Sequence, residues 1–443
     1  MSSQPSSVMQ QLIERITNHT AQVGVVGLGY VGLPFAVEKA KVGFSVVGIE
    51  QNSQRAARVN RADNYIADVS DEELKTLVQA GKIQAFTSFD RVTDMDVIVI
   101  CVPTPLTKNL TPDLSYIEKV TTEIAHHLRP GQLISLESTT YPGTTDEIMR
   151  PLLEHHSGLK QGCDFFLSHS PERVDPGNQR YTTKNTSKVV GASDARSLEV
   201  ATLFYQQTIE HVVPVSSAKT AELVKIFENT FRAVNIALVN ELALLCDRID
   251  IDVWEVLDAA NTKPFGIMPF YPGPGVGGHC IPIDPHYLEW KAKEVNFNTR
   301  FIALAGEINR RMPSFVRSKA CRVLNQLGLA PSRSKILLIG VTYKKDLADW
   351  RESPAMAVME LLLQEGAALS YHDPYVPSLR LGHHELISVE LTDDVLTDAD
   401  LVVITTEHSQ IDFGRVLALS KAILDTRGIT RHLPDPGHKV TRL

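Results

Sequence analysis

The feature that most constrains the fold is the stretch from residue 22 to residue 50, QVGVVGLGYVGLPFAVEKAKVGFSVVGIE. It reads as an apolar strand, a glycine-rich turn, an amphipathic helix and a second strand that ends at Glu50. Strands that alternate with helices in this way are typical of parallel sheets with helices on both faces. The sequence therefore predicts an α/β fold with a doubly wound sheet.

The turn in this stretch carries the spacing G-x-G-x-x-G at Gly27, Gly29 and Gly32, and Glu50 follows 18 residues after the last glycine. Glycines at this spacing allow a tight turn and a close approach of a pyrophosphate to a helix N-terminus, and the carboxylate can bind ribose hydroxyls. These features predict a dinucleotide site. Because an acid at Glu50 would repel a 2′-phosphate, NAD is favoured over NADP, although Arg55 lies close enough in sequence to line the adenosine.

Further apolar strands follow, in DVIVICVPTPL, QLISLESTTYPGTT, DFFLSHSPERVDPGN, KVVGA and HVVPV. Ligands of open α/β sheets bind beyond the carboxyl ends of the strands. Here those ends are rich in Thr, Ser, Pro and Glu, which suits a binding crevice. A single residue of this kind, such as Thr139 or Glu172, is by itself more often a loop-capping side chain.

From residue 216 the pattern changes to one long helix, SSAKTAELVKIFENTFRAVNIALVNELALLCDRIDI. Val224, Phe227, Phe231, Val234 and Leu238 form a continuous apolar stripe, which suggests a spine between domains and a subunit interface. A second face of this helix carries Lys225 and Asn229, which are four residues apart and can point at one ligand.

The stretch from residue 271 to residue 287, YPGPGVGGHCIPIDPHY, is too rich in Gly and Pro for a helix or a central strand. We expect an ordered loop that presents Cys280 as a nucleophile, with Asp284 nearby and the role of His279 left open. A free cysteine is more often a small buried hydrophobe. We expect that of the other cysteines, which have apolar neighbours: Cys101, Cys163, Cys246 and Cys321.

A second α/β pattern occupies the last third of the chain, in KILLIGVTYKKD, RESPAMAVMELLLQEG, AALSYHDP, LVVITTEH and KAILDTRG. It has only Gly340 at the first strand end, so a second dinucleotide is not expected. Lys344, Lys345 and Arg351 suit a diphosphate or another anion, although Lys345 is readily explained as a solvated charge. We expect three domains: 1–215 for NAD, 216–328 as a central helical domain with the cysteine loop, and 329–443 as a second Rossmann-like domain.

Composition narrows the class of protein. The net charge of −8 argues against a general nucleic-acid or membrane-surface binder, and no signal peptide or membrane span is recognised. The five cysteines are odd in number, scattered, and without metal-ligand spacing, so we expect no disulfide framework and no metal. These observations together predict a reduced, cytoplasmic globular protein.

A hydride acceptor, a nucleophilic thiol and an anion cradle fit one reaction class. Oxidation of an alcohol gives an aldehyde, and addition of a thiolate gives a thiohemiacetal. Loss of a second hydride gives a thioester, which water releases as an acid. The residues alone do not identify the substrate.

Several long motifs resemble the nucleotide-sugar dehydrogenases of the UDP-glucose/GDP-mannose dehydrogenase superfamily, from about Val23 to the C-terminus. They are GLGYVGLP, CVPTPL, ESTTYPGTT, SPERVDPGN, AELVKIFENTFRAVNIALVNELA, GPGVGGHCIPIDP and GVTYKKDLADWRESP. The resemblance implies two Rossmann-like domains joined by a long central helix, and a dimer or dimer-based homo-oligomer built on that helix. It also implies a four-electron oxidation of C6 of a UDP-sugar to the uronate, with reduction of two NAD.

The resemblance also implies roles for individual residues. Cys280 is the nucleophile, Asp284 assists the water step, Lys225 and Asn229 stabilise the C6 oxygen, and Thr139 and Glu172 flank the reacting carbon. The expected cofactor-binding residues are Gly27, Gly29, Tyr30, Val31, Gly32, Glu50, Arg55, Pro103, Thr104, Thr139 and Arg351. The expected substrate-binding residues are Glu172, Arg173, Val174, Lys225, Asn229, Tyr271, Gly273, Gly275, Tyr343 and Lys344.

The motif SPERVDPGN resembles the branch that oxidises UDP-N-acetylhexosamines for surface polysaccharides. The UDP-glucose branch has an apolar residue after the glutamate and a second acid four residues on, whereas this chain has Arg173 and Pro176. Within the acetamido branch, UDP-N-acetylglucosamine is the expected substrate and UDP-N-acetylmannosamine the runner-up.

Two other classes compete with this interpretation. A two-electron β-hydroxyacid dehydrogenase shares the Rossmann start, the long helix and a Lys–Asn pair, but it needs neither the cysteine loop nor the last third. A non-catalytic NAD-binding scaffold would not need Lys225, Asn229, Cys280 and Asp284 together.

Overall fold

The computed structural model describes residues 7–66, 68–107, 109, 111–175, 178, 180–278 and 280–443. The chain forms two compact units. Unit 1 comprises residues 1–228 and 290–297, and unit 2 comprises residues 229–289 and 298–443. The chain passes from one unit to the other three times: within α8 (Ala218–Ile249), within α10 (Asp284–Lys293), and between residues 297 and 298.

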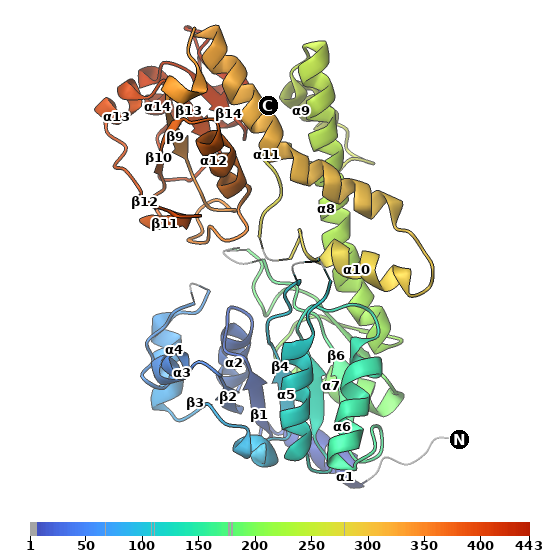
Figure 1. Ribbon diagram of the computed structural model, residues 1–443. Helices are drawn as coiled ribbons and strands as arrows, with labels where there is room; N and C mark the ends of the chain where they lie inside the picture. The colour runs from blue at the N-terminus through green and yellow to red at the C-terminus, as the bar shows by residue number, and fades with distance from the viewer. Residues whose placement is uncertain are drawn as a thin grey trace. The chain divides into compact units, whose positions relative to one another are not determined.

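Unit 1 is built on an eight-stranded sheet with the order β3-β2-β1-β4-β5-β6-β7-β8 (Figure 1). The strands are β1 (Gln22–Val26), β2 (Ser45–Ile49), β3 (Ile83–Phe86), β4 (Val97–Ile100), β5 (Leu133–Leu136), β6 (Phe166–His169), β7 (Lys188–Ala192) and β8 (Val212–Val215). The helices are α1 (Ser7–Thr17), α2 (Gly32–Lys41), α3 (Ser53–Asn60), α4 (Asp71–Gln79), α5 (Ser115–His126), α6 (Arg150–Ser157) and α7 (Ala195–Gln206), with the short turns η1 (Asp90–Asp94) and η2 (Thr144–Met149).

Both faces of this sheet are covered, since every residue of the central strands β4, β5 and β6 is buried. Val25 and Val99 belong to the core cluster that also holds buried side chains of α1, α2 and α7. Their strand neighbours Ile98 and Ile100 are also fully buried and point to the opposite face, in front of which α5 and α6 lie in Figure 1. This arrangement confirms the predicted doubly wound fold.

The expectation of an all-parallel sheet is wrong for the last two strands. The first six strands are parallel, but β7 pairs antiparallel with β6, with Ser168 opposite Ala192 and His169 opposite Gly191. A parallel neighbour would need a crossover helix, and the described residues between β6 and β7 form none. β8 is parallel to β7 because α7 connects them.

Unit 2 contains a five-stranded parallel sheet with the order β10-β9-β13-β14-β15 and a hairpin of β11 and β12. The strands are β9 (Lys335–Ile339), β10 (Ala368–His372), β11 (Ser378–Leu381), β12 (His384–Ile387), β13 (Leu401–Ile404), β14 (Ile423–Asp425) and β15 (Val440–Arg442). The helices are α9 (Val253–Asn261), α11 (Arg300–Gln326), α12 (Pro354–Gln364), α13 (Asp393–Asp398) and α14 (Phe413–Leu419), with the turns η3 (Pro331–Arg333) and η4 (Ile429–His432). The predicted second α/β unit is therefore confirmed.

The helix α8 is continuous over 32 residues, as its apolar periodicity predicted. Part of the apolar stripe is exposed: Phe227 by 61%, Phe231 by 41% and Leu238 by 62%. The second half of α8 packs against α9 through Ala243 and Trp254. A helix this long that leaves large apolar side chains in solvent has a face available for a partner.

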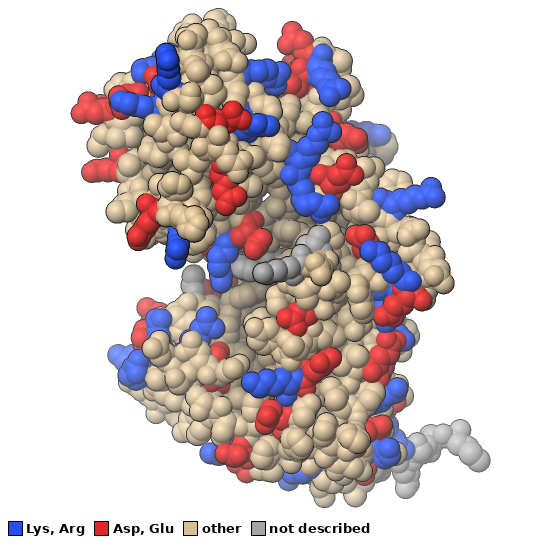
Figure 2. Space-filling view, in the orientation of Figure 1, with Lys and Arg blue, Asp and Glu red and all other residues tan. Residues whose placement is uncertain are grey.

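The described surface carries mixed charge. On the face shown in Figure 2, lysine and arginine side chains lie among aspartates and glutamates. None of the helices in the described part of the chain has both the length and the hydropathy of a membrane span.

Candidate functional site

The glycine-rich turn between β1 and α2 is shaped by two close backbone approaches. Gly27 has φ +91°, and a Cβ atom there would lie 2.5 Å from the carbonyl oxygen of Cys101. A Cβ atom on Gly32 would lie 1.9 Å from the carbonyl oxygen of Gly27. A Cβ atom on Gly29, in contrast, would meet nothing within 4 Å. The turn thus requires glycine at positions 27 and 32, whereas the absence of a side chain at Gly29 leaves open space next to the turn.

The acid predicted at the end of β2 faces this turn. Glu50 is buried, and its Oε2 accepts a hydrogen bond from the N–H of Leu28 at 3.1 Å. Its Oε1 accepts from the N–H of Asn52 at 2.9 Å, and Asn52 caps α3, on which Arg55 is exposed. Each carboxylate oxygen has a second lone pair for a ribose hydroxyl. The turn and the acid therefore fit the adenosine diphosphate half of NAD.

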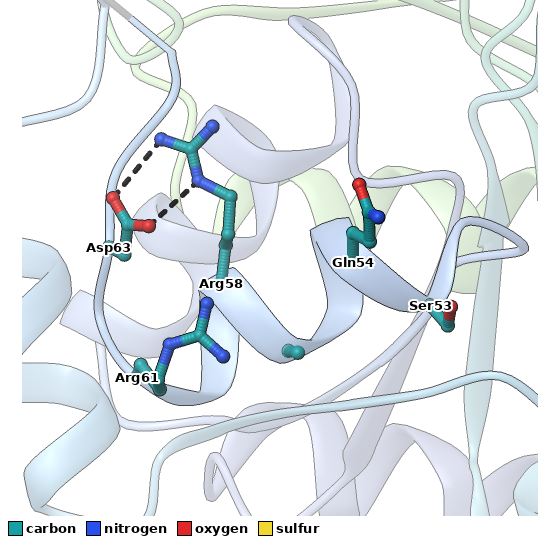
Figure 3. A pocket seen from close by; sticks show the side chains of 6 residues that line it. Ser53, Gln54, Arg58, Arg61 and Asp63 are labelled. Atoms are coloured by element: carbon teal, nitrogen blue, oxygen red, sulfur yellow. Dashed lines mark hydrogen bonds and ion pairs between the residues drawn. The ribbon is translucent and has the colours of Figure 1, made fainter.

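A hollow of about 410 Å³ lies beside the glycine turn. It brings together four residues predicted as cofactor or substrate ligands, namely Tyr30, Val31, Glu172 and Val174. Tyr30 is 49% exposed, so its ring is accessible to a ligand. A second, more open hollow of about 490 Å³ lies over the outer face of α3 (Figure 3). Arg58 forms a bidentate ion pair with Asp63 there, and no predicted site residue lines it.

Glu172 belongs to a charged cluster that the sequence did not predict. The ammonium of Lys188 lies 3.2 Å from Oε2 of Glu172 and 2.9 Å from Oε2 of Glu137. Lys188 and Glu137 are 4% and 1% exposed. The phenol of Tyr205 donates to Oε1 of Glu137 at 2.9 Å and contacts Ser135 at 2.8 Å. We call Glu137, Lys188 and Glu172 the carboxylate–lysine cluster.

Each of the three charged groups shifts the pKa of the others. Burial raises the pKa of Glu137 to about 7, although Lys188 opposes this effect. Burial would also raise the pKa of Glu172, but Lys188, the N–H groups of Val174 and Arg173, and Lys225 together hold it below its usual value. Burial opposes a charge on Lys188, yet its two carboxylate partners raise the pKa of Lys188. The result is an ionised Glu172 beside a buried acid that titrates near neutrality.

The turn after β5, which carries Thr139, is tied to the first turns of α8. The buried carboxylate of Glu222 accepts hydrogen bonds from the N–H of Gly143 at 2.5 Å and the N–H of Thr145 at 2.8 Å. It also accepts from the hydroxyl of Thr145 at 2.6 Å. Burial raises the pKa of Glu222 to about 7. Lys225 follows one turn later on the same helix.

Pro103 and Thr104 lie in the segment after β4, where Ser138 donates to the carbonyl of Val102 at 2.8 Å. This bond joins the ends of β4 and β5. β4 and β5 are neighbours in the sheet. The predicted cofactor residues that follow them, Pro103, Thr104 and Thr139, therefore lie beyond the same edge of the sheet.

Arg173 was predicted as a substrate ligand, but its guanidinium has partners within the protein. It pairs with the carboxylate of Glu228 on α8, at 2.6 Å and 3.2 Å, and donates to the carbonyl of Ser187 at 2.5 Å. Glu228 lies between Lys225 and Asn229 along the helix. Arg173 thus connects the segment after β6 to the part of α8 that carries the predicted catalytic pair.

In unit 2, the structure brings two predicted catalytic residues into contact. The side-chain amide of Asn229 donates to Oδ2 of Asp284 at 2.5 Å, and Asp284 is 2% exposed. Asp284 opens α10, and its own N–H donates to the carbonyl of Cys280 at 2.8 Å. Cys280 is partly exposed. The thiol, the carboxylate and the amide therefore belong to one local structure.

The glycines before Cys280 approach other segments of unit 2 closely. Gly273 donates to the side chain of Asn240 on α8 at 3.0 Å. Gly275 has φ +138°, and a Cβ atom there would lie 2.9 Å from Pro354. Cβ atoms on Gly277 and Gly278 would meet Tyr343, another predicted substrate residue, at 2.7 Å and 3.0 Å. Larger side chains at Gly275, Gly277 and Gly278 would therefore displace this part of the loop.

Tyr271 starts this loop and stacks on Trp254 of α9, with ring centroids 5.6 Å apart. Its hydroxyl donates to Oδ1 of Asp258 at 2.8 Å. The ring is 37% exposed. Tyr271 is thus held in place by α9 and still accessible to a ligand.

Lys344, Tyr343 and Arg351 all lie between β9 and α12, as predicted, and Arg351 forms an ion pair with Asp349 at 2.9 Å. The turn that carries Lys344 includes Asp346, which has φ +59°. Its N–H donates to Nδ1 of the buried His408 at 3.0 Å.

Because Nδ1 of His408 accepts this bond, Nε2 carries the ring proton and donates to Oδ2 of Asp373 at 3.0 Å. Asp373 also accepts from the N–H of Val341 at 2.7 Å. Burial would raise the pKa of Asp373, but His408 and backbone donors keep it below its usual value. The imidazole thus joins two strand ends and fixes the Lys344 turn.

The remaining four cysteines differ in burial. Cys246 is buried and Cys101 and Cys321 are partly buried, but the expectation of a buried Cys163 is wrong, because it lies exposed in the turn before β6. His279 and Pro176 lie outside the described residues.

The site residues predicted from the sequence do not include Glu137, Lys188, Glu222, Glu228 or His408. The available signal was weak: charged residues at the ends of otherwise apolar strands and helices, with nothing to say which of them meet. Only the tertiary structure pairs them.

Three domains described for one family match the chain in order. The "UDP-glucose/GDP-mannose dehydrogenase family, NAD binding domain" matches residues 21–209, the central domain of that family matches residues 219–311, and its UDP binding domain matches residues 337–432. These matches cover the glycine turn, the cysteine loop and the Lys344 turn.

Individual relatives agree with these matches. The chain is 35% identical over 419 residues to a UDP-N-acetyl-D-mannosamine dehydrogenase of Pyrococcus horikoshii, covering 93% of this chain and 97% of the relative. It is 36% identical over 356 residues to a UDP-N-acetyl-D-glucosamine 6-dehydrogenase of Pseudomonas aeruginosa, covering 80% and 83%. A solved structure of the UDP-D-ManNAc dehydrogenase from P. horikoshii superimposes with a TM-score of 0.86 at 33% identity, covering 95% of this chain and 98% of that one.

Proposed function

The chain belongs to the UDP-glucose/GDP-mannose dehydrogenase family and is an NAD-dependent UDP-sugar dehydrogenase, and we propose that it oxidises C6 of a UDP-N-acetylhexosamine to the carboxylate. The observation that carries the proposal is the local structure of Cys280, Asp284 and Asn229: the backbone carbonyl of the partly exposed Cys280 accepts from the N–H of Asp284, whose buried carboxylate accepts from the amide of Asn229. A simple two-electron dehydrogenase has no use for this thiol.

NAD, when bound, accepts one hydride in each of two oxidations. The groups of the chain perform the remaining steps. Lys225 and Asn229 donate hydrogen bonds to the C6 oxygen and stabilise its developing negative charge. The Sγ atom of Cys280 adds to the aldehyde carbon to give a thiohemiacetal, whose oxidation leaves a thioester.

Hydrolysis completes the reaction. Water adds to the thioester carbon, the carbon–sulfur bond breaks, and the thiolate of Cys280 leaves as the uronate forms. Asp284 accepts a proton from the attacking water, and Thr139 and Glu172 hold water and the reacting C6 group in place. The overall reaction consumes one water and two NAD and releases two NADH.

The configuration of the sugar at C2 has two candidates. The run ESTTYPGTTDE together with SPERVDPGN favours UDP-N-acetylglucosamine, our first candidate. The fuller coverage of the P. horikoshii relative, 97% of its length, favours UDP-N-acetylmannosamine. Either uronate would be a precursor of a surface polysaccharide.

The test is NADH formation with UDP-glucose, UDP-N-acetylglucosamine and UDP-N-acetylmannosamine in parallel, with wild type, Cys280→Ser and the control Cys163→Ser. Two NADH per sugar are expected from wild type and from the control, whose cysteine is exposed and distant in sequence. If Cys280→Ser still produced two NADH per sugar, the covalent mechanism would be wrong. If UDP-glucose were the best substrate, the assignment to the acetamido branch would fail.

We also propose a homodimer through the exposed apolar face of α8, defined by Phe227, Phe231 and Leu238. A charged residue in place of one of these side chains would stay in solvent in a monomer but would be buried in the dimer, so it should weaken dimerisation. Light scattering on wild type and on Leu238→Glu measures the outcome. A wild-type monomer, or a Leu238→Glu protein of unchanged mass, would contradict the dimer.

A further inference from the structure

The carboxylate–lysine cluster lies at the ligand-binding edge of the sheet because one strand is reversed. Continuing the pairing of Ser168 with Ala192 and His169 with Gly191 by three residues places Glu172 opposite Lys188. In a parallel strand, the first residue would lie at the opposite edge. The reversal of β7 therefore delivers an ammonium to the edge where β5 and β6 end.

The lysine adds a third hydrogen-bond donor to the two backbone donors that hold Glu172. The N–H groups of Arg173 and Val174 both donate to Oε1 at 2.8 Å, and Lys188 contacts Oε2 at 3.2 Å. The carboxylate is thus fixed by three donors on two oxygens, and it lines the hollow beside Tyr30 and Val31. Such an arrangement sets both the orientation and the charge of the group.

Lys188 is itself held in place from the interior. Its second carboxylate partner, Glu137, is anchored by the phenol of Tyr205, which is fully buried between the sheet and α7. A buried ion pair is weak evidence for stability, since apolar residues of the same volume are often as stable. The ammonium of Lys188, however, contacts Glu172 as well as Glu137, and an apolar residue could not provide that contact.

Building on the proposed function, we propose that Lys188 is a positioning residue of the oxidation. Its ammonium, anchored by Glu137, holds Oε2 of Glu172 toward the reacting C6 group and keeps that carboxylate ionised. Lys188 itself does not touch the substrate. The other titratable groups that interact with the cluster are Lys39, Cys101, His169, Tyr205 and Lys225.

The main test compares Lys188→Met with the double variant Lys188→Met/Glu137→Gln. Lys188→Met leaves the buried carboxylate of Glu137 and the partly buried carboxylate of Glu172 without this cation, so it loses both stability and activity. The double variant removes the unpaired buried charge and recovers the thermal midpoint, but Glu172 still lacks its donor. We expect kcat to fall by about 100-fold in both variants, the scale of an error of about 1 Å in placement. Lys160→Met, which alters an exposed lysine of the same unit, is the control.

The pH profile separates positioning from folding. Without Lys188, the acid limb of kcat moves to higher pH, because the Glu172 carboxylate is then protonated more easily. Wild-type kcat in Lys188→Met, or recovery of kcat together with stability in the double variant, would overturn the proposal. The second result would make Lys188 a structural charge partner only.

A readout without turnover keeps this test separate from the proposed function. Infrared absorption of protonated carboxyl groups is measured against pH in wild type, Lys188→Met and Lys188→Met/Glu172→Gln. Because Glu137 and Glu222 already have pKa values of about 7, the proposal expects one additional protonated carboxyl near neutral pH in Lys188→Met relative to wild type, and expects it to disappear when Glu172 is replaced; identical spectra would refute it. A wild-type protein that forms no NADH from any UDP-sugar would instead refute the proposed function.

Discussion

The side-chain amide of Asn229 donates a 2.5 Å hydrogen bond to the carboxylate of Asp284, which joins α8 to the first turn of α10. Asp284 is 2% exposed, so few groups other than those of the protein can satisfy its oxygens. The same carboxylate is proposed to assist thioester hydrolysis. Its placement therefore depends on a residue that the substrate also needs.

Replacement of Asn229 with leucine should consequently affect both folding and catalysis. A lost hydrogen bond to a buried carboxylate lowers the free energy of unfolding by about 2 kcal/mol. We expect kcat to fall by at least about tenfold, with a smaller change in KM. Urea unfolding and steady-state kinetics measure these effects. Asn235→Leu is the matched control, because Asn235 lies on the same helix and bonds only locally to the carbonyl of Phe231; equal effects of the two substitutions would contradict the prediction.

The two glycines Gly29 and Gly32 should respond differently to alanine. A Cβ atom on Gly32 meets the carbonyl oxygen of Gly27 at 1.9 Å, so Gly32→Ala must distort the turn and lower the thermal midpoint. A Cβ atom on Gly29 meets nothing within 4 Å, so Gly29→Ala should fold normally and lose only the space for a pyrophosphate. Calorimetry and NAD titration test the pair. Normal NAD affinity in Gly29→Ala would show that the pyrophosphate does not approach this turn.

The buried carboxylate of Glu222 should make stability depend on pH. Burial raises its pKa from 4.5 to about 7, so the folded state retains a proton that the unfolded state has lost. Its contribution to the free energy of unfolding is thus fully present below about pH 4.5. It then declines by roughly 3 kcal/mol as the pH rises through 7.

Urea midpoints of wild type and Glu222→Gln across pH 5 to 8 isolate this contribution. The difference between the two proteins should change with pH, whereas Glu118→Gln, on the exposed face of α5, should run parallel to wild type. Parallel curves for Glu222→Gln would rule out the titration of Glu222 in this range.

His408 should control binding at the Lys344 turn. His408→Phe removes the acceptor of the Asp346 N–H and the donor to Asp373, each buried or half-buried, at a cost of about 1–3 kcal/mol per unsatisfied group. Since the left-handed turn at Asp346 would relax, we expect UDP to bind about tenfold more weakly in isothermal titration. His383→Phe, in the exposed β11–β12 turn, is the control. Unchanged UDP affinity in a folded His408→Phe protein would show that His408 does not control UDP binding through this turn.

Much of the fold could be predicted because the helices, strands and turns are each specified by residues within their own segment. The glycine spacing from Gly27 to Gly32, the apolar strands and the period of α8 each report the structure of their own segment. The order of β1, α2 and β2 then implied a parallel pairing, which the structure contains.

The sequence could not predict the strand reversal or the contacts that follow from it. Whether β7 runs with or against β6 depends on a connection that carries no helix, and apolar strands read alike in both directions. In the sequence, Lys188 is only the first residue of the predicted strand KVVGA, and no local pattern identifies its partners. The same limit applies to Glu222 and His408, whose partners are 77 and 62 residues distant at Thr145 and Asp346.

The reversal of β7 also means that the segment between Glu172 and Lys188 can change in length without moving either residue. Glu172 and Lys188 lie three residues beyond the last pair of β6 and β7, His169 and Gly191, so their contact follows from the antiparallel direction of β7 and not from the number of residues between them. Insertions, deletions and exchanges in that segment can therefore accumulate during evolution while the charged pair stays in register. A protein engineer could use the same freedom, grafting the segment from a relative to change sugar preference while retaining the carboxylate it serves.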